Sequence, residues 1–174
     1  MRILVIGAGS IGGYFGGRLH QAGRDVTFLV REARANALRQ SGLKIRSATG
    51  DLHIEHPKLM LASEIDGQYD LVILSCKAYD LEGAISSFSP AVGPGTVILP
   101  LLNGMRHLDL LDAAFGRERV FGGACMISTT LDRDGTIVHM GEMQNLVFGP
   151  RTDRPAVSGS AVLAQLSNAL SFCT

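Results

Sequence analysis

A glycine-rich turn near the N-terminus limits the folds open to this chain more than any other stretch. Residues 3–6 form an apolar, β-branched run of the kind found in strands that are buried on both faces. Gly7, Gly9 and Gly12 follow in the spacing GxGxxG, and the residues after them have helical periodicity. In such a strand–turn–helix unit the glycines allow a tight turn, close backbone approach to a pyrophosphate, and close packing of helix on strand.

The turn is therefore predicted to bind the phosphates of a dinucleotide at the N-terminus of the helix that follows it. A glycine pattern of this kind is weak evidence by itself, because kinases and ordinary turns also contain it. Its position between a predicted strand and a predicted helix makes it specific. The residues of this predicted glycine loop are Gly7, Ala8, Gly9, Ser10, Ile11 and Gly12.

The composition indicates one globular domain and argues against several classes of function. The chain has 174 residues, of which 46% are hydrophobic and 18% charged, so it can bury a substantial core. Its formal net charge is zero, so we expect neither nucleic acid nor a membrane surface as a partner. No signal peptide or membrane span is recognised, which predicts a cytoplasmic protein. Cys76, Cys125 and Cys173 are interpreted as reduced thiols, and no metal site is predicted.

Apolar runs alternate with helical patterns along the chain. The pattern predicts helices over 10–22, 32–39, 81–88, 108–115 and 155–170. It predicts strands over 3–6, 25–30, 43–46, 52–56, 70–75, 96–102, 119–129, 136–140 and 145–148, a loop over 90–95 and the start of another strand over 171–174. The expected fold class is α/β: a Rossmann-type, mostly parallel sheet with helices on both faces and an antiparallel extension at the C-terminal side.

Three polar residues are predicted to lie at the carboxyl ends of strands, on the same edge as the glycine loop. Arg31 ends the second strand, where an NAD site places an acid about 20 residues beyond the glycines to bind the ribose 2′-hydroxyl. A guanidinium there can pair with a 2′-phosphate, which favours NADP(H); Glu32 would restore an acid if the strand ended one residue later. Lys77 and Asn103 follow two other strands. Each alone could be a solvated surface residue, but polar groups that converge on one edge predict a ligand site.

Taken together, the motifs resemble those of 2-dehydropantoate 2-reductase, also called ketopantoate reductase. In chain order they are GAGSIGG (7–13), Arg31, SCKAYD (75–80), LLNGM (101–105) and DGTIVHMG (134–141). The resemblance implies an NADPH-dependent reduction of 2-dehydropantoate, a 2-oxo acid, to pantoate on the route to pantothenate and coenzyme A. It implies that the glycine loop holds the pyrophosphate, Arg31 the 2′-phosphate, and Lys77 the nicotinamide ribose. Asn103 would touch both cofactor and substrate, and Lys77 and Asn103 would orient the reacting centre as catalytic residues.

The same resemblance implies a second, mostly helical domain that supplies the general-acid lysine and further substrate contacts. We expect residues 1–174 to be the NADP-binding domain alone, without that domain, and nearly inactive on ketopantoate. The apolar surface left uncovered is expected to favour self-association into a homo-oligomer. Two alternatives stay open: a reductase of another 2-oxo or 3-oxo acid with the same architecture, and a stand-alone NADP-binding sensor module. A flavoprotein is less favoured, because FAD sites also place an acid where Arg31 stands.

Overall fold

Five parallel strands form the central sheet of the structure. The structure is a computed structural model that describes residues 1–151, 164 and 167–168. The strands of this sheet, sheet A, are β1 (Arg2–Ile6), β2 (Asp25–Leu29), β5 (Leu59–Met60), β6 (Tyr69–Leu74) and β7 (Val92–Pro100). Their order is β5-β2-β1-β6-β7, and every neighbouring pair is parallel. Such a parallel sheet with β1 at its centre confirms the predicted Rossmann-type α/β class.

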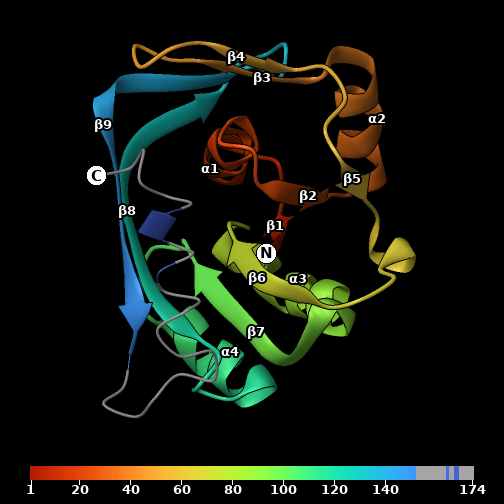
Figure 1. The fold of residues 1–174 in the computed structure, drawn as a ribbon, viewed down its shortest axis with the longest axis vertical. Helices are drawn as coiled ribbons and strands as arrows, with labels where there is room; N and C mark the ends of the chain where they lie inside the picture. The colour runs from red at the N-terminus through yellow and green to blue at the C-terminus, as the bar shows by residue number, and fades with distance from the viewer. Residues whose placement is uncertain (152–163, 165–166, 169–174) are drawn as a thin grey trace.

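Helices cover both faces of sheet A (Figure 1). The α-helices are α1 (Ser10–Gln21), α2 (Glu32–Ser41), α3 (Leu81–Phe88) and α4 (Arg106–Phe115). Short 3-10 turns are η1 (Ala62–Glu64), η2 (Ala78–Asp80) and η3 (Ser89–Ala91). In β1, Ile3 and Val5 share a core with α1 and α2, whereas Leu4 and Ile6 share a core with α3 and α4. Within the expected helix over 155–170, the described residues 164, 167 and 168 are helical. The rest of that helix and the expected strand over 171–174 lie outside the part of the chain that is described.

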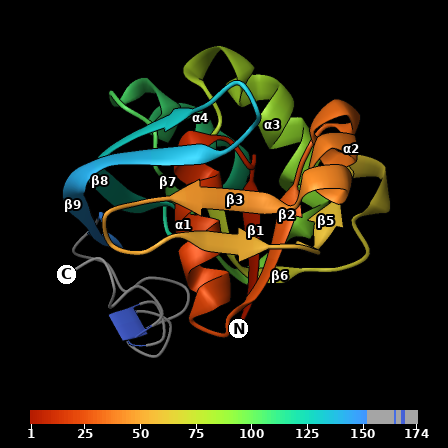
Figure 2. The same cartoon turned by 90° about the horizontal axis from the view of Figure 1, so that it is seen from above.

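A second sheet, sheet B, covers α1 on the side away from sheet A (Figures 1 and 2). Its strands are β3 (Leu43–Arg46), β4 (Leu52–Ile54), β8 (Phe121–Leu131) and β9 (Ile137–Pro150). Their order is β4-β3-β9-β8, antiparallel except for the parallel pair β3 and β9. The predicted antiparallel extension is therefore present, and it forms a sheet of its own that also takes in the β3–β4 hairpin.

Glycines in α1 let the helix pack closely against both sheets. A Cβ at Gly16 would lie 2.5 Å from the ring of Phe28 in β2, and one at Gly17 would lie 2.7 Å from Ile45 in β3. A Cβ at Gly13 would overlap a β9 side chain. Glycine costs about 1 kcal/mol against alanine within a helix. Here that cost is offset by contact with two sheets at once.

The predicted loop over 90–95 was wrong, because β7 already begins at Val92. Val92 pairs with Tyr69, and the register then shifts before Leu71 pairs with Val97. The Thr96 hydroxyl donates to the Tyr69 carbonyl oxygen at 2.6 Å, which holds this irregular segment to β6. A Gly-Pro-Gly stretch is tolerated at such an irregular strand start, although the sequence reads as a turn.

The two short strands expected over 136–140 and 145–148 are one long strand, β9. His139 pairs with Thr129 and Gln144 pairs with Ile127, so residues 140–143 form a bulge within the strand. Gly141 has a φ of +98° in this bulge, a value that only glycine adopts easily. The polar, glycine-containing bulge interrupts the hydrophobic pattern, and this is why the sequence suggests two strands.

Candidate functional site

Four loops meet at the carboxyl edge of sheet A. Arg31 follows β2, the glycine loop follows β1, Lys77 follows β6 and Asn103 follows β7, and these four strands are consecutive in the sheet. Leu74 pairs with Pro100 at the ends of β6 and β7, so Lys77 and Asn103 both stand three residues beyond paired positions. Ligands of open α/β sheets bind in the crevice outside this edge. The structure thus brings the residues predicted from the sequence to one edge, which we call the rim.

Each glycine of the loop meets a different steric demand. Gly7 has a φ of +90° and donates its N–H to the Leu29 carbonyl oxygen at 2.9 Å. A Cβ at Gly12 would overlap the Ser75 hydroxyl and the Gly7 carbonyl oxygen. A Cβ at Gly9 would meet no protein atom within 4 Å, so the space beside this residue is open. The pattern fits the turn, the close packing and the phosphate approach expected of the three glycines.

The N-terminus of α1 ends in this open space. Gly9 is the N-cap and supplies no side-chain hydrogen bond, and the first turn contains no acidic residue. Ala8 is buried, whereas Ser10 and Ile11 are partly exposed. The first N–H groups of a helix have no intrahelical acceptor, and their partial positive charge favours an anion. The loop can therefore hold the pyrophosphate of a dinucleotide.

Arg34 in α2 holds the glycine loop by hydrogen bonds to its backbone, a role that the sequence does not reveal. Its Nε and Nη2 atoms donate to the Ala8 carbonyl oxygen at 3.0 and 2.8 Å. The guanidinium also lies close to the β8–β9 turn, where a Cβ at Gly135 would be 3.1 Å from Nη1. Burial lowers the pKa of Arg34, but an arginine remains charged in proteins. The sequence shows only that Arg34 stands one helical turn after Arg31, near the same edge of the sheet.

Arg31 lies at the rim and is paired with an acid from another loop. The structure places Arg31 at the N-cap of α2 and Glu32 as the first helical residue, so the arginine directly follows the end of β2 and Val30. Its Nη2 donates to Asp80 Oδ1 at 2.6 Å, and this hydrogen bond raises the pKa of Arg31. Asp80 ends η2, just after Lys77. No local pattern marks this contact, because the two residues are far apart in the chain.

Lys77 and Asn103 are exposed at the rim. Within the described residues, neither side chain has a hydrogen bond or an ion pair, so both are available to a ligand. Cys76 stands beside Lys77, and burial raises the pKa of its thiol to about 11. The thiol is therefore neutral near pH 7 and is a poor nucleophile. The polar groups that this part of the rim offers are an ammonium group and an amide.

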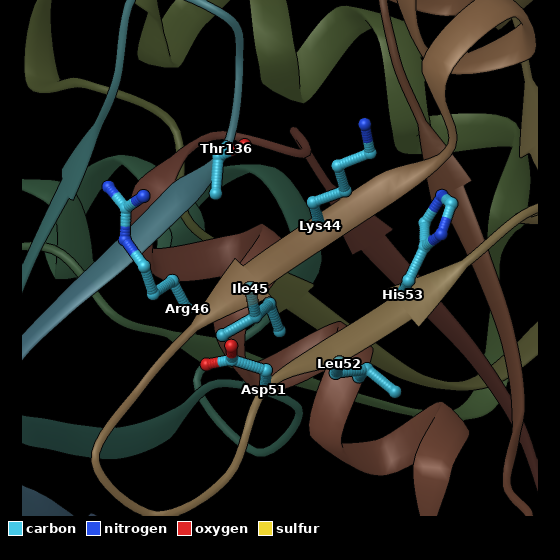
Figure 3. Close-up of a pocket in the computed structure, with 7 residues that line it drawn as sticks. All are labelled: Lys44, Ile45, Arg46, Asp51, Leu52, His53 and Thr136. Atoms are coloured by element: carbon cyan, nitrogen blue, oxygen red, sulfur yellow. The ribbon is translucent and has the colours of Figure 1, made fainter.

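A hollow of about 490 Å³ lies elsewhere, on the β3–β4 hairpin (Figure 3). The residues that line it are Lys44, Ile45, Arg46, Asp51, Leu52, His53 and Thr136. None of them belongs to the rim. The described ranges contain no group of His, Cys, Asp and Glu side chains placed to hold a metal ion. They also contain no helix with the length and apolarity needed to cross a membrane.

The family model described as "Ketopantoate reductase PanE/ApbA" matches residues 3–153. The chain belongs to the ketopantoate reductase family. Among the relatives of this ketopantoate reductase chain is the "Uncharacterized oxidoreductase YkpB" of Bacillus subtilis (strain 168), 46% identical over 158 residues. That match covers 88% of this chain and 52% of the relative. The chain spans about half the length of the curated relatives it matches.

Solved structures agree with the family assignment. The crystal structure of 2-dehydropantoate 2-reductase from Geobacter metallireducens GS-15 matches this ketopantoate reductase chain with a TM-score of 0.86 and 32% identity. The match covers 97% of this chain and 56% of that one. A ternary structure of D-mandelate dehydrogenase with NADH and anilino(oxo)acetate matches with a TM-score of 0.84 and 28% identity, over 98% of this chain and 54% of that one. The fold is thus that of an oxidoreductase family with NAD(P)-dependent members.

Proposed function

We propose that this chain supplies the cofactor-binding half of an NADPH-dependent enzyme that reduces 2-dehydropantoate to pantoate, a cytoplasmic step toward pantothenate and coenzyme A. The observation that carries the proposal is the rim, where an open glycine loop lies in line with Arg31, Lys77 and Asn103. Family membership supports the reaction type. Because the chain matches only about half the length of its relatives, we assign the complete activity to a longer protein.

Each rim residue has a distinct task in this proposal. When bound, NADPH supplies a hydride to the carbonyl carbon of the 2-oxo acid. The N–H groups of the glycine loop bind the pyrophosphate, and Arg31 binds the 2′-phosphate. The Lys77 ammonium holds the ribose next to the nicotinamide, and the Asn103 amide orients both cofactor and substrate. Reduction also requires a proton donor for the carbonyl oxygen, which we assign to the half of the longer relatives that residues 1–174 do not match.

Gly9 offers a sharp test of the cofactor assignment. Its φ of −83° is accessible to alanine, and its surroundings leave room for a methyl group. Gly9→Ala should therefore keep the fold yet place a methyl group where the phosphates approach, and weaken NADPH binding by tenfold or more in a fluorescence or calorimetric titration. Gly83→Ala, at an equally open position in α3, is the matched control and should leave binding unchanged. Wild-type affinity in the Gly9→Ala variant would remove the glycine loop from the site.

A second assay tests the assignment of this chain as half of an enzyme. The 174 residues alone should oxidise NADPH with 2-dehydropantoate only negligibly, because we assign one wall of the site and the proton donor to the half of the relatives that they do not match. Substantial turnover by the chain alone would contradict the division of the site between two domains.

A different 2-oxo acid is the second candidate substrate. The D-mandelate dehydrogenase neighbour, whose structure holds NADH and anilino(oxo)acetate, shows that this fold is used with an aromatic 2-oxo acid analogue. A panel of 2-oxo acids, assayed with a protein of the full length of the relatives, separates the two. Faster reduction of an aryl 2-oxo acid than of 2-dehydropantoate would favour the second candidate.

A further inference from the structure

We infer that Asp80 sets the ratio of NADPH to NADH affinity. Its carboxylate forms an ion pair with Arg31 and so competes with the 2′-phosphate of NADPH for the guanidinium. The inference rests on the proposed function, since it concerns the cofactor of the same site. It adds a specificity-determining residue that belongs to neither the glycine loop nor the second strand.

Arg31 differs from the other polar residues of the rim in already having an anionic partner. Its Nη2 lies 2.6 Å from Asp80 Oδ1, whereas the Lys77 and Asn103 side chains have no partner among the described residues. The Arg31 side chain is 80% exposed and long, so it can turn toward a ligand. The Asp80 side chain is 31% exposed.

The backbone of Asp80 is held in a turn that begins at Lys77. Its N–H donates to the Lys77 carbonyl oxygen at 2.9 Å, which closes the η2 turn, and the residue is also the N-cap of α3. The turn keeps Asp80 at the rim, three residues after Lys77, and its short side chain reaches Arg31. A ligand that binds the Arg31 guanidinium where it now lies comes within a few ångströms of this carboxylate, and one that draws the guanidinium away must break its ion pair with Asp80.

A carboxylate at this place should weaken the binding of NADPH and strengthen the binding of NADH. The 2′-phosphate of NADPH is an anion that needs the same guanidinium, so Asp80 competes for its donors and repels it. NADH carries a hydroxyl there, which can donate to a carboxylate, as it does to the acid of ordinary NAD sites. The rim thus combines an arginine that favours NADPH with an acid, from a different strand end, that favours NADH.

Titration of four proteins with both cofactors tests the inference. Wild type, Asp80→Asn, Glu82→Gln and the double variant Arg31→Gln/Asp80→Asn are titrated with NADPH and with NADH by calorimetry at fixed ionic strength. Asp80→Asn should raise the ratio of NADPH to NADH affinity by about tenfold, which is 1.4 kcal/mol. Glu82→Gln removes one negative charge two residues further on and should change the ratio less than twofold. In the double variant the gain should disappear.

The outcomes separate this inference from the proposed function. An unchanged or lower ratio in Asp80→Asn, with both cofactors still bound by wild type, would show that Asp80 does not compete with the phosphate, and only the inference falls. Binding of neither cofactor by wild type would overturn the proposed function, and the inference with it. The gain in Asp80→Asn should also shrink in 0.5 M salt, because screening weakens the repulsion that the substitution removes. A gain that persists in full at high salt would contradict the electrostatic cause.

Discussion

The carbonyl group of Ala8 accepts two hydrogen bonds from one guanidinium, so the shape of the glycine loop depends on Arg34. Arg34→Met keeps most of the aliphatic stem of the side chain and removes both donors. Hydrogen bonds from charged groups contribute about 1.5–3 kcal/mol, so we expect the free energy of unfolding to fall by about 1–3 kcal/mol and NADPH affinity to fall about tenfold. Urea denaturation and titration measure the two effects. Arg39→Met, on the exposed side of the same helix, is the control; identical behaviour of both variants would argue against the role of Arg34.

His107 in α4 is buried, and we expect it to make the protein less stable in mild acid. Burial and, secondarily, the charge of Arg151 lower the pKa of His107. The folded protein therefore binds a proton less readily than the unfolded chain, whose histidine keeps an ordinary pKa near 6.5. The stabilising contribution is complete above about pH 6.5 and is lost as pH falls below it. Urea midpoints at pH 7.5 and 5.5 should differ less in His107→Gln than in wild type, whereas the exposed His56→Gln should keep the wild-type difference.

The sequence is enough to place residues that directly follow parallel strands at a ligand-binding edge, because the carboxyl ends of such strands meet there. Arg31, Lys77 and Asn103 were placed at the rim for this reason, and the structure has them there. The contacts of Arg34 with Ala8 and of Arg31 with Asp80 could not be predicted in the same way. Each contact joins segments far apart in the chain, and which acid pairs with Arg31 depends on where η2 turns.

At the scale of elements, α1 has little room beside its glycines. Gly16→Ala gains about 1 kcal/mol of helix propensity, yet its Cβ would lie 2.5 Å from the Phe28 ring, which is itself fully buried. Overpacking of a core costs typically 1–3 kcal/mol, so we expect a net loss of stability of up to about 2 kcal/mol. Gly83→Ala in α3 meets open space and should stabilise the protein by up to about 1 kcal/mol. Thermal denaturation of both variants gives the comparison, and equal gains would refute the tight packing of α1.

Helices were easier to predict than irregular strands. The helix over 81–88 has the predicted bounds, because its apolar residues recur at helical intervals. In contrast, β7 and β9 owe their extent to partners: a shifted register beside β6 in one case and a bulge opposite Ile127 and Thr129 in the other. Pairing with the preceding strand extends β7 through Gly-Pro-Gly and β9 through residues 140–143, where the local sequence favours turns.

At the scale of the whole molecule, sheet B presents apolar side chains to solvent. The large hydrophobic residues exposed on β8 and β9 are Met126, Leu131, Met140, Met143 and Val147. Exposed apolar surface favours association, so we expect the average mass in light scattering to rise with protein concentration. Val147→Lys should reduce that rise, and Lys44→Glu, on the polar hairpin of the same sheet, should leave it unchanged. A constant monomer mass at high concentration would contradict this prediction.

The parallel contact of β3 with β9 also has a consequence for the time course of folding. Ile45 pairs with Ile137, so sheet B cannot close until most of the chain has left the ribosome, whereas β1, α1 and β2 can associate early. Late, long-range pairing is slow and leaves partly folded chains prone to aggregation. We therefore expect the amides of β3 to gain protection in pulse-labelled hydrogen exchange after those of β1 and β2. Until sheet B closes, the side of α1 that carries Gly13 and Gly17 is exposed to solvent in the nascent protein.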